Sequence, residues 1–182
     1  MGRDGRRRRT EPVRRPGHRQ ARERGCAARA AGGDRPVGRR FRGVLKHRLT
    51  LPVRWSESDP AGIAFYPRFF EWFDVATASL FARIDEPWER CFRTHDILGV
   101  PVVEAGATFR APVRFGDTLT LECEVTDITD RTFRVEHRIS VGPTLCATGF
   151  ERRAWVERPG VPDGRLRARP IPDAVRRKLG GG

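Results

Sequence analysis

An acidic loop and the aromatic segment after it hold the residues best suited to chemistry. Ser56 to Gly62 is polar and rich in turn formers, so a loop open to water or a ligand is expected. From Pro67 the chain becomes apolar, and proline suits the first turn of a helix, where its missing N–H costs nothing. The loop therefore delivers Asp59 to a helix start, where N–H groups are free and the dipole is positive. A carboxylate beside unpaired donors is suited to acyl transfer, because it can attack or activate water while the donors hold an oxyanion.

Asp59 has a second interpretation from its own residues. An Asp-Pro-Ala-Gly sequence is typical of a turn, and a turn or N-cap aspartate would fit it without any catalysis. Glu57 is the neighbouring carboxylate, and we interpret it as a solvated loop residue. A dehydratase would pair a histidine with an acid, and the absence of histidine in or near the Asp59 loop argues against that chemistry.

The segment that begins at Pro67 predicts a buried helix. A narrow polar strip is made by Arg68, Glu71 and Asp74. Apolar residues cover almost every other side of the helical wheel: Phe69, Phe70, Trp72, Phe73, Val75, Ala76, Ala78, Leu80, Phe81 and Ile84. A helix that is apolar all round must be enclosed by other structure.

Alternation of apolar and polar residues predicts strands on both sides of this helix. We expect them over 49–55, 103–115, 119–125, 133–141 and 144–157, with 84–97 as a polar connection. Pro52 indicates an edge strand or an irregular position, and the blurred alternation of the last segment indicates a bulge. Because short turns force antiparallel neighbours, the predicted fold is α+β, with one long helix wrapped by an antiparallel sheet of about five strands.

The ordered motifs resemble the 4-hydroxybenzoyl-CoA thioesterase-like family of hotdog-fold acyl-CoA thioesterases. The matching residues are Asp59-Pro60-Ala61-Gly62-Ile63, Tyr66-Pro67, the aromatic run ending Trp72-Phe73-Asp74, Pro87-Trp88, Gly99-Val100-Pro101 and the strand around Phe109. The likeness covers roughly residues 49–156. It implies the hotdog fold, with sheets paired into a homodimer or homotetramer and with sites between subunits.

The resemblance also implies roles for individual residues. Asp59 matches the catalytic carboxylate, which serves as a nucleophile or as a general base, with the nucleophile favoured by the family. The N–H of Tyr66 matches the donor that polarises the thioester carbonyl. Asp74 matches a substrate-facing position, although it also fits the polar strip of the helix. Trp88 lines the acyl pocket or caps the core.

The residues expected to contact coenzyme A match the family pattern less well. Arg131 matches a basic turn that meets nucleotide phosphates in the family, but Asp130 opposes it. Arg134, Arg152 or Arg153 would have to compensate, which keeps a carrier-protein thioester open as substrate. Val100 stands where relatives have threonine, so a shifted acyl preference is also open.

The positive charge lies almost wholly in the first segment. Residues 1–48 hold 17 Lys+Arg against 4 Asp+Glu, whereas residues 49–182 hold 19 of each. We expect residues 1–43 to be a disordered basic extension, 44–158 the hotdog thioesterase domain, and 159–182 a tail with a short helical turn. The extension fits a nucleic-acid-binding arm, a transit peptide, a merely solvated segment, or a wrongly assigned extension that is not a genuine part of the protein.

Cysteine and histidine usage bears on compartment and cofactors. Cys26, Cys91, Cys123 and Cys146 are scattered without Cys-x-x-Cys pairs, which indicates free thiols in a reducing cytoplasm and no structural zinc site. His137 lies on an apolar strand face and is expected to be a core histidine, while His95 lies in a loop without a motif. No apolar run is long enough to span a membrane, and no metal or redox cofactor is implied.

Together these features predict an acyl-CoA thioesterase that converts a thioester and water to a carboxylate and free coenzyme A. The aromatic helix favours an aromatic or medium-length acyl group. The alternatives are an acyl-carrier-protein thioesterase, a hotdog protein that binds acyl-CoA without turnover, and a nucleic-acid-binding protein that uses residues 1–43. The neutral remainder of the chain offers no basic face to extend that arm, which argues against the last alternative.

Overall fold

A computed structural model describes residues 45–158 and 165–181, so the basic extension expected over 1–43 lies outside the described residues. The elements in chain order are β1 (Lys46–Pro52), η1 (Trp55–Glu57), α1 (Pro67–Arg83), α2 (Trp88–Thr94), β2 (Ile97–Gly99), β3 (Val102–Phe109), β4 (Thr118–Ile128), β5 (Thr132–Val141), β6 (Thr144–Ala154), β7 (Val156–Glu157) and α3 (Asp173–Leu179).

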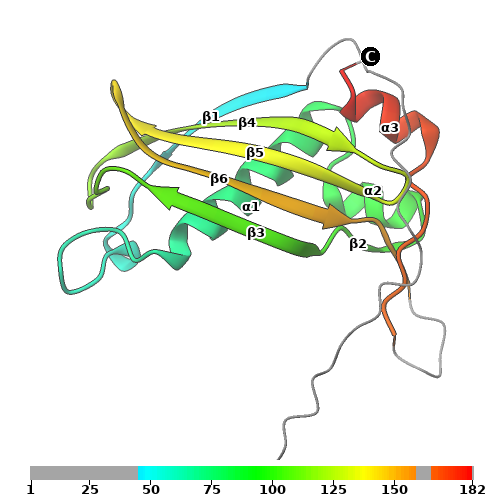
Figure 1. Ribbon diagram of the computed structural model, residues 1–182, viewed down its shortest axis with the longest axis horizontal. Coiled ribbons are helices and arrows are strands. Elements are labelled where there is room, and N and C mark those ends of the chain that lie inside the picture. The colour runs from blue at the N-terminus through cyan, green and yellow to red at the C-terminus, as the bar shows by residue number, and fades with distance from the viewer. Residues whose placement is uncertain (1–44, 159–164, 182) are drawn as a thin grey trace, which may run out of the picture. The chain divides into compact units, whose positions relative to one another are not determined.

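One five-stranded antiparallel sheet curls around α1 (Figure 1). Its order is β1-β4-β5-β6-β3, so β1 and β3 are the edges. This arrangement confirms the predicted α+β class and the single long helix. Pro52 ends β1, which pairs only with β4, in agreement with the edge position predicted for it.

The core lies between α1 and the concave face of the sheet. Phe73, Leu80 and Phe81 of the helix are fully buried there. Phe73 packs where β6 carries Gly149, and a Cβ at that glycine would stand 2.4 Å from the Phe73 ring and 2.7 Å from the Gly106 carbonyl oxygen. The missing side chain of Gly149 is therefore what lets the helix approach the sheet.

Two predicted strands end earlier than the alternation suggests. The strand expected over 103–115 stops at Phe109, because the amides of Arg110 and Ala111 both bond to the Cys146 carbonyl and Pro112 has no N–H to donate. The last strand divides into β6 and β7, and β7 pairs with β2. The predicted bulge is confirmed: Ile139 faces Ala147 while Ser140 faces Leu145, which leaves Cys146 as the extra residue.

The prediction of a polar connection over 84–97 is wrong. This segment contains α2, whose Cys91 is fully buried, and then Ile97, which is also fully buried. The sequence signal was weak because a helix of seven residues spans only about two turns and shows little periodicity.

The helical turn expected near the C-terminus is α3, and it packs against the rest of the domain. Ile171, Val175 and Leu179 are buried. Lys178 pairs with Glu86 at 2.6 Å, and Arg176 pairs with Asp130 at 3.3 Å. Among the described residues, no helix is both long and apolar enough to cross a membrane.

Candidate functional site

The loop that carries Asp59 is closed by its own backbone. The Asp59 amide donates to the Ile63 carbonyl at 2.9 Å, and the Gly62 amide donates to the Asp59 carbonyl at 2.9 Å. Gly62 has φ of +74°, a conformation that glycine adopts without strain. A bridge between Ser58 and Ala64 then seals the base of the loop. The loop therefore presents Asp59 at a fixed place directly before α1.

The Asp59 carboxylate is oriented by one oxygen and open at the other. Oδ1 accepts the Ala61 amide at 2.8 Å, which is the turn geometry that the Asp-Pro-Ala-Gly sequence suggested. Oδ2 accepts no hydrogen bond and forms no ion pair with any described residue. The turn role and the catalytic role are thus compatible, because they use different oxygens.

Tyr66 stands at the N-cap of α1 with its ring 61% exposed. The next amides in the helix are taken, since Arg68 donates to the Phe65 carbonyl at 2.9 Å and Phe69 donates to the Tyr66 carbonyl at 3.2 Å. Within the described part of the chain, no hydrogen bond uses the Tyr66 N–H. A donor without a partner at a helix start is suited to hold a negative oxygen.

An apolar pocket of about 420 Å³ opens beside this donor. Its lining comes from the loop, the first turn of α1 and the segment after β3: Ile63, Ala64, Tyr66, Phe69, Phe109, Arg110, Ala111, Pro112 and Val113. Phe69 and Phe109 meet edge to face, with centroids 4.9 Å apart. Aromatic walls next to a hydrogen-bond donor fit an acyl group whose carbonyl reaches the helix start.

Glu57 is a structural residue, so the prediction that it is a solvated loop residue is wrong. Its carboxylate accepts the Arg54 amide at 2.6 Å and the indole N–H of Trp72 at 3.2 Å. These bonds attach η1 to α1. Of the two acidic residues in the loop, Asp59 is therefore the one with a free oxygen.

A buried charged network crosses the middle of α1. Arg153 and Glu151 are only 3% and 2% exposed, and Arg153 Nη2 lies 3.0 Å from Glu151 Oε1. Thr77 donates to Glu151 at 2.9 Å, and Arg153 also donates to the Val100 carbonyl at 3.1 Å. Burial alone would raise the pKa of Glu151, but His137, Arg153 and Thr77 outweigh it, so this pKa lies below its ordinary value.

Arg153 brings together two residues that the resemblance marks as substrate-binding. It pairs with the Asp74 carboxylate, and its guanidinium lies 5.2 Å from the Trp88 ring centroid. This centre was not predicted from the sequence, although the period of β6 places Gly149, Glu151 and Arg153 on one face. His137 lies in the core as predicted, stacked on Phe73 with centroids 4.5 Å apart.

The chain was compared with known protein families, and the match covers the domain described above. The model of the thioesterase-like superfamily matches residues 53–179, from the end of β1 through α3. The chain belongs to the thioesterase-like superfamily. Solved structures agree: 4-hydroxybenzoyl-CoA thioesterase from Pseudomonas sp. strain CBS-3 matches at TM-score 0.66 and 26% identity, covering 73% of this chain and 99% of that chain. A gentisyl-coenzyme A thioesterase matches at TM-score 0.63 and 29% identity, covering 71% and 99%. The predicted hotdog fold is confirmed.

Curated relatives of this superfamily member are thioesterases as well. The 4-hydroxybenzoyl-CoA thioesterase of Pseudomonas sp. (strain CBS-3) is 28% identical over 89 residues, which is 48% of this chain and 63% of that protein. A 1,4-dihydroxy-2-naphthoyl-CoA hydrolase of Synechococcus sp. (strain WH7803) is 25% identical over 138 residues, covering 72% and 87%. The chain thus spans somewhat less than two thirds of the first relative and most of the second.

Within a single chain of this thioesterase-like protein, Arg131 does not lie near the Asp59 loop. It lies in the β4–β5 turn, at the end of the sheet beside α3, whereas the Asp59 loop lies at the opposite end (Figure 1). Its side chain is 3.6 Å from Asp130 and donates to the Ala168 carbonyl at 3.4 Å. Arg134 and Arg152 are also engaged, with Glu136 and Asp127 respectively.

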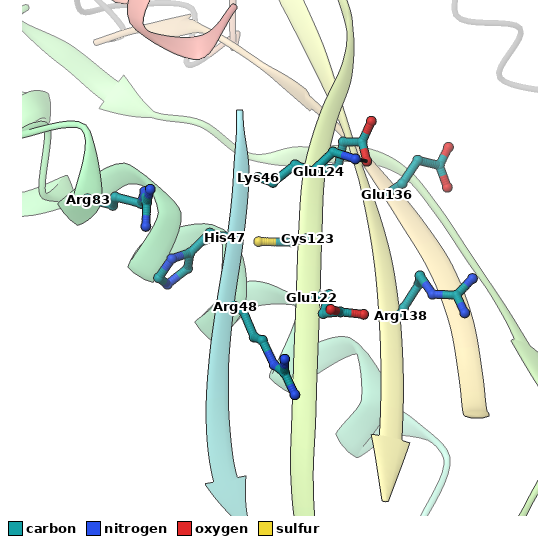
Figure 2. Close-up of a pocket in the computed structure, with 9 residues that line it drawn as sticks. All are labelled: Lys46, His47, Arg48, Arg83, Glu122, Cys123, Glu124, Glu136 and Arg138. Atoms are coloured by element: carbon teal, nitrogen blue, oxygen red, sulfur yellow. Dashed lines mark ion pairs between the residues drawn. The ribbon is translucent and has the colours of Figure 1, made fainter. Parts of the chain in front are cut away.

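A second pocket of about 350 Å³ lies at the β1 edge (Figure 2). In Figure 2, Arg83 of α1 and His47 of β1 lie to one side of β4, while Glu136 and Arg138 lie to the other. Burial and the charge of Arg83 lower the pKa of His47, and Lys46 is paired with Glu124 at 3.2 Å. Its lining carries charges of both signs and includes neither Asp59 nor Tyr66.

Proposed function

We propose that this chain hydrolyses acyl-CoA thioesters, with Asp59 as the catalytic carboxylate and the Tyr66 N–H as the oxyanion donor. The observation that carries the proposal is the division of labour at Asp59: Oδ1 is held by the Ala61 amide, and Oδ2 is open. The Tyr66 N–H, without a partner among the described residues, begins the helix that follows the same loop. Membership of the thioesterase-like superfamily supports the assignment.

Two routes fit this geometry. In the first, Asp59 Oδ2 attacks the thioester carbonyl, the C–S bond breaks and coenzyme A leaves as the thiolate. Water then opens the mixed anhydride to free acid and Asp59, and a proton of that water converts the thiolate to the thiol. In the second, Oδ2 takes a proton from water as its oxygen attacks the carbonyl, the C–S bond breaks, and Asp59 returns the proton to the leaving coenzyme A thiolate. In both routes the Tyr66 N–H stabilises the negative oxygen of the tetrahedral intermediate. The anhydride route is preferred, because the family that the sequence resembles favours a nucleophilic aspartate.

We propose an aromatic, hydroxylated acyl group. The pocket beside Tyr66 is apolar and has aromatic walls. Asp74, whose side chain is 51% exposed, is held by buried Arg153 and offers a carboxylate that can accept a hydrogen bond from a phenolic hydroxyl. Trp88 contacts the same guanidinium with its ring. The named relatives act on 4-hydroxybenzoyl, gentisyl and 1,4-dihydroxy-2-naphthoyl thioesters, which are all of this class.

A second copy of the chain is proposed to complete the site. The edge strand β3 exposes Val102, Val103 and Phe109, of which Val103 is 58% exposed. Its Phe109 end borders the acyl pocket, and its Val102 end pairs with Arg153, near the turn that carries Arg131. Antiparallel pairing of two β3 strands places the partner's Val102 end beside this chain's pocket. The partner's Arg131 is then on the correct side to meet coenzyme A phosphates.

We propose a cytoplasmic location. Cys91, Cys123 and Cys146 are free and buried, as expected of a protein kept in a reducing compartment.

The proposal is tested by measuring thiol release over a panel of thioesters. The panel holds 4-hydroxybenzoyl-CoA, a dihydroxylated aryl-CoA, benzoyl-CoA, a medium-chain and a long-chain acyl-CoA, and the same acyl groups on an acyl carrier protein. We expect hydroxylated aryl-CoA to have the highest kcat/KM. If only the carrier-protein thioesters are hydrolysed, the substrate is an acyl carrier protein and not an acyl-CoA. If acyl-CoA binds without thiol release, the assignment as an enzyme is contradicted.

A further inference from the structure

Three side chains of types that bind metals lie together at α2, near the end of α1 that is away from the Asp59 loop. One donor atom each of Glu86, Cys91 and His95 lies within 4.8 Å of the other two. Cys91 is fully buried, while the side chains of Glu86 and His95 are 12% and 18% exposed. No step of the proposed hydrolysis uses these three residues.

The fold fixes each donor by a separate contact. Cys91 and His95 are four residues apart, and the His95 amide donates to the Cys91 carbonyl at 3.0 Å, so both side chains share one helix face. The His95 ring lies against Trp155, with centroids 5.5 Å apart, and Arg169 donates to the His95 carbonyl at 2.7 Å. Such outer contacts orient ligands at metal sites.

Each oxygen of the Glu86 carboxylate has its own neighbour. Lys178 of α3 donates to Oε1 at 2.6 Å, and Oε2 faces His95. The carboxylate can therefore give Oε2 to a cation while Lys178 keeps Oε1.

The His95 Nε2 atom is buried and has no hydrogen-bond partner. It stands 3.4 Å from Glu86 Oε2, within reach of an ion pair but without a hydrogen bond. Two ligands of a tetrahedral zinc ion, each about 2.0–2.1 Å from the metal, stand about 3.3 Å apart. The observed separation therefore also accommodates a zinc ion between the two atoms, and a buried ring nitrogen that makes no hydrogen bond calls for an explanation.

We propose that Glu86, Cys91 and His95 bind one zinc ion, with water as the fourth ligand, contrary to the sequence-based expectation of no structural zinc site. A thiolate, an imidazole and a carboxylate are the ligand types that zinc shares, whereas magnesium and calcium prefer oxygen alone. The Cys91 thiol gives its proton to solvent when the metal binds. The site connects α2 to α3 through Lys178, so its effect is structural.

A thiol nucleophile does not explain the cluster. Burial and the neighbouring Glu86 raise the pKa of Cys91 to about 12, and the sulfur has no access to a substrate.

The test uses the full chain, stripped of metal and titrated with zinc against a chromophoric chelator. We expect one tight zinc site per chain, a higher Tm with zinc and no change with the same concentration of magnesium. Cobalt in place of zinc should give a thiolate-to-metal charge-transfer band. Cys91→Ala should abolish this band, and Cys91→Ala and His95→Gln should each weaken zinc binding by more than the about 10–100-fold typical of a second-shell change.

Cys123→Ala is the matched control, because Cys123 is also a buried free thiol but has no histidine or carboxylate in such a cluster. It should keep the zinc affinity and the cobalt band. His95→Gln keeps the test informative if Cys91→Ala is poorly folded, since His95 lies at the helix end. Absence of tight zinc binding, or equal affinity in wild type, Cys91→Ala and His95→Gln, would overturn the proposal.

Discussion

Asp59 stabilises its loop through one carboxylate oxygen, and its other oxygen makes no hydrogen bond to a described residue. The bond from the Ala61 amide to Oδ1 at 2.8 Å needs only an acceptor, which an asparagine side chain also supplies. The open Oδ2 needs a negative charge to attack or to take a proton. The two tasks can therefore be separated by a single substitution.

Asp59→Asn is expected to lower kcat by roughly 10³ or more, with little change in KM, because it removes an interaction used mainly in the transition state. Thermal unfolding should barely change, since the turn bond is kept. Steady-state kinetics and calorimetry measure both. Asp117→Asn is the matched control, because Asp117 accepts the Arg114 amide at 2.7 Å in another turn. If Asp59→Asn keeps a tenth of the activity, Asp59 serves the turn alone.

The two chemical routes differ in where water oxygen goes. With enzyme in excess in ¹⁸O-water, an anhydride hydrolysed at the aspartyl carbon places the label on Asp59 and leaves the first product acid unlabelled. Mass spectrometry of the loop peptide reads the label. Label in the acid alone would fit a general base, or anhydride opening at the substrate carbon, and would leave the preferred route without support.

Glu151 should make stability depend on acid. Its pKa is lowered in the folded state, so its contribution to the unfolding free energy is complete above its ordinary value of 4.5 and is lost as the pH falls through the lower folded value. Denaturant unfolding from neutral pH down to about pH 3 should show this loss in wild type. The loss of unfolding free energy with falling pH should be smaller in Glu151→Gln. At neutral pH this variant should be roughly 3–5 kcal/mol less stable than wild type, because Arg153 is left buried without its partner.

Glu122→Gln is the control for that measurement, because Glu122 is exposed on β4 and should leave the acid dependence unchanged. An equal loss of unfolding free energy in wild type and Glu151→Gln would show that the buried network does not couple folding to this proton.

The contact between α1 and β6 depends on a missing side chain. Gly149→Ala would place a methyl group 2.4 Å from the Phe73 ring, so the helix or the strand must move. We expect a loss of roughly 1–3 kcal/mol in the free energy of unfolding, the usual cost of overpacking a core. Chemical denaturation measures it, and Phe73→Leu in the same chain should recover part of the loss.

Gly106→Ala is the comparison for this substitution. Its added methyl group would stand 2.7 Å from the ring of Phe150, which is only half-buried and is covered by the Arg134 guanidinium, a flexible side chain. The loss should therefore be smaller than for Gly149→Ala. If Gly149→Ala has the same free energy of unfolding as wild type, the close packing of α1 on β6 does not depend on this glycine.

At the element scale, the sequence predicts best where a long pattern is uninterrupted. The aromatic run after Pro67 predicts α1, and the alternation around Leu121 and Val135 predicts the central strands. The pattern fails where tertiary contacts decide: α2 has one fully buried residue, Cys91, and β3 stops because Cys146 is bulged. Asp59 and Tyr66 were predicted from a local motif, whereas Arg153 and Asp74 are 79 residues apart and meet only in the fold.

At the scale of the whole molecule, β3 is the edge that a second copy is proposed to cover. Val103→Lys should shift a dimer toward monomer in light scattering, because a lysine on an edge strand opposes strand pairing. Leu166→Lys is the matched control, since both side chains are 58% exposed and Leu166 lies outside the sheet. A stable monomer in wild type at micromolar concentration, or an unchanged dimer in Val103→Lys, would contradict pairing through β3.

The Asp59 loop and Arg131 lie at opposite ends of the same sheet, and this separation has a genetic consequence. If each site takes its acid from one chain and its basic turn from the other, Asp59→Asn and Arg131→Glu can complement each other. A mixed pair would contain one site with both defects and one site with neither. Co-expressed variants, each impaired as a homodimer, should therefore recover hydrolysis together, as two alleles that restore a function neither supplies alone.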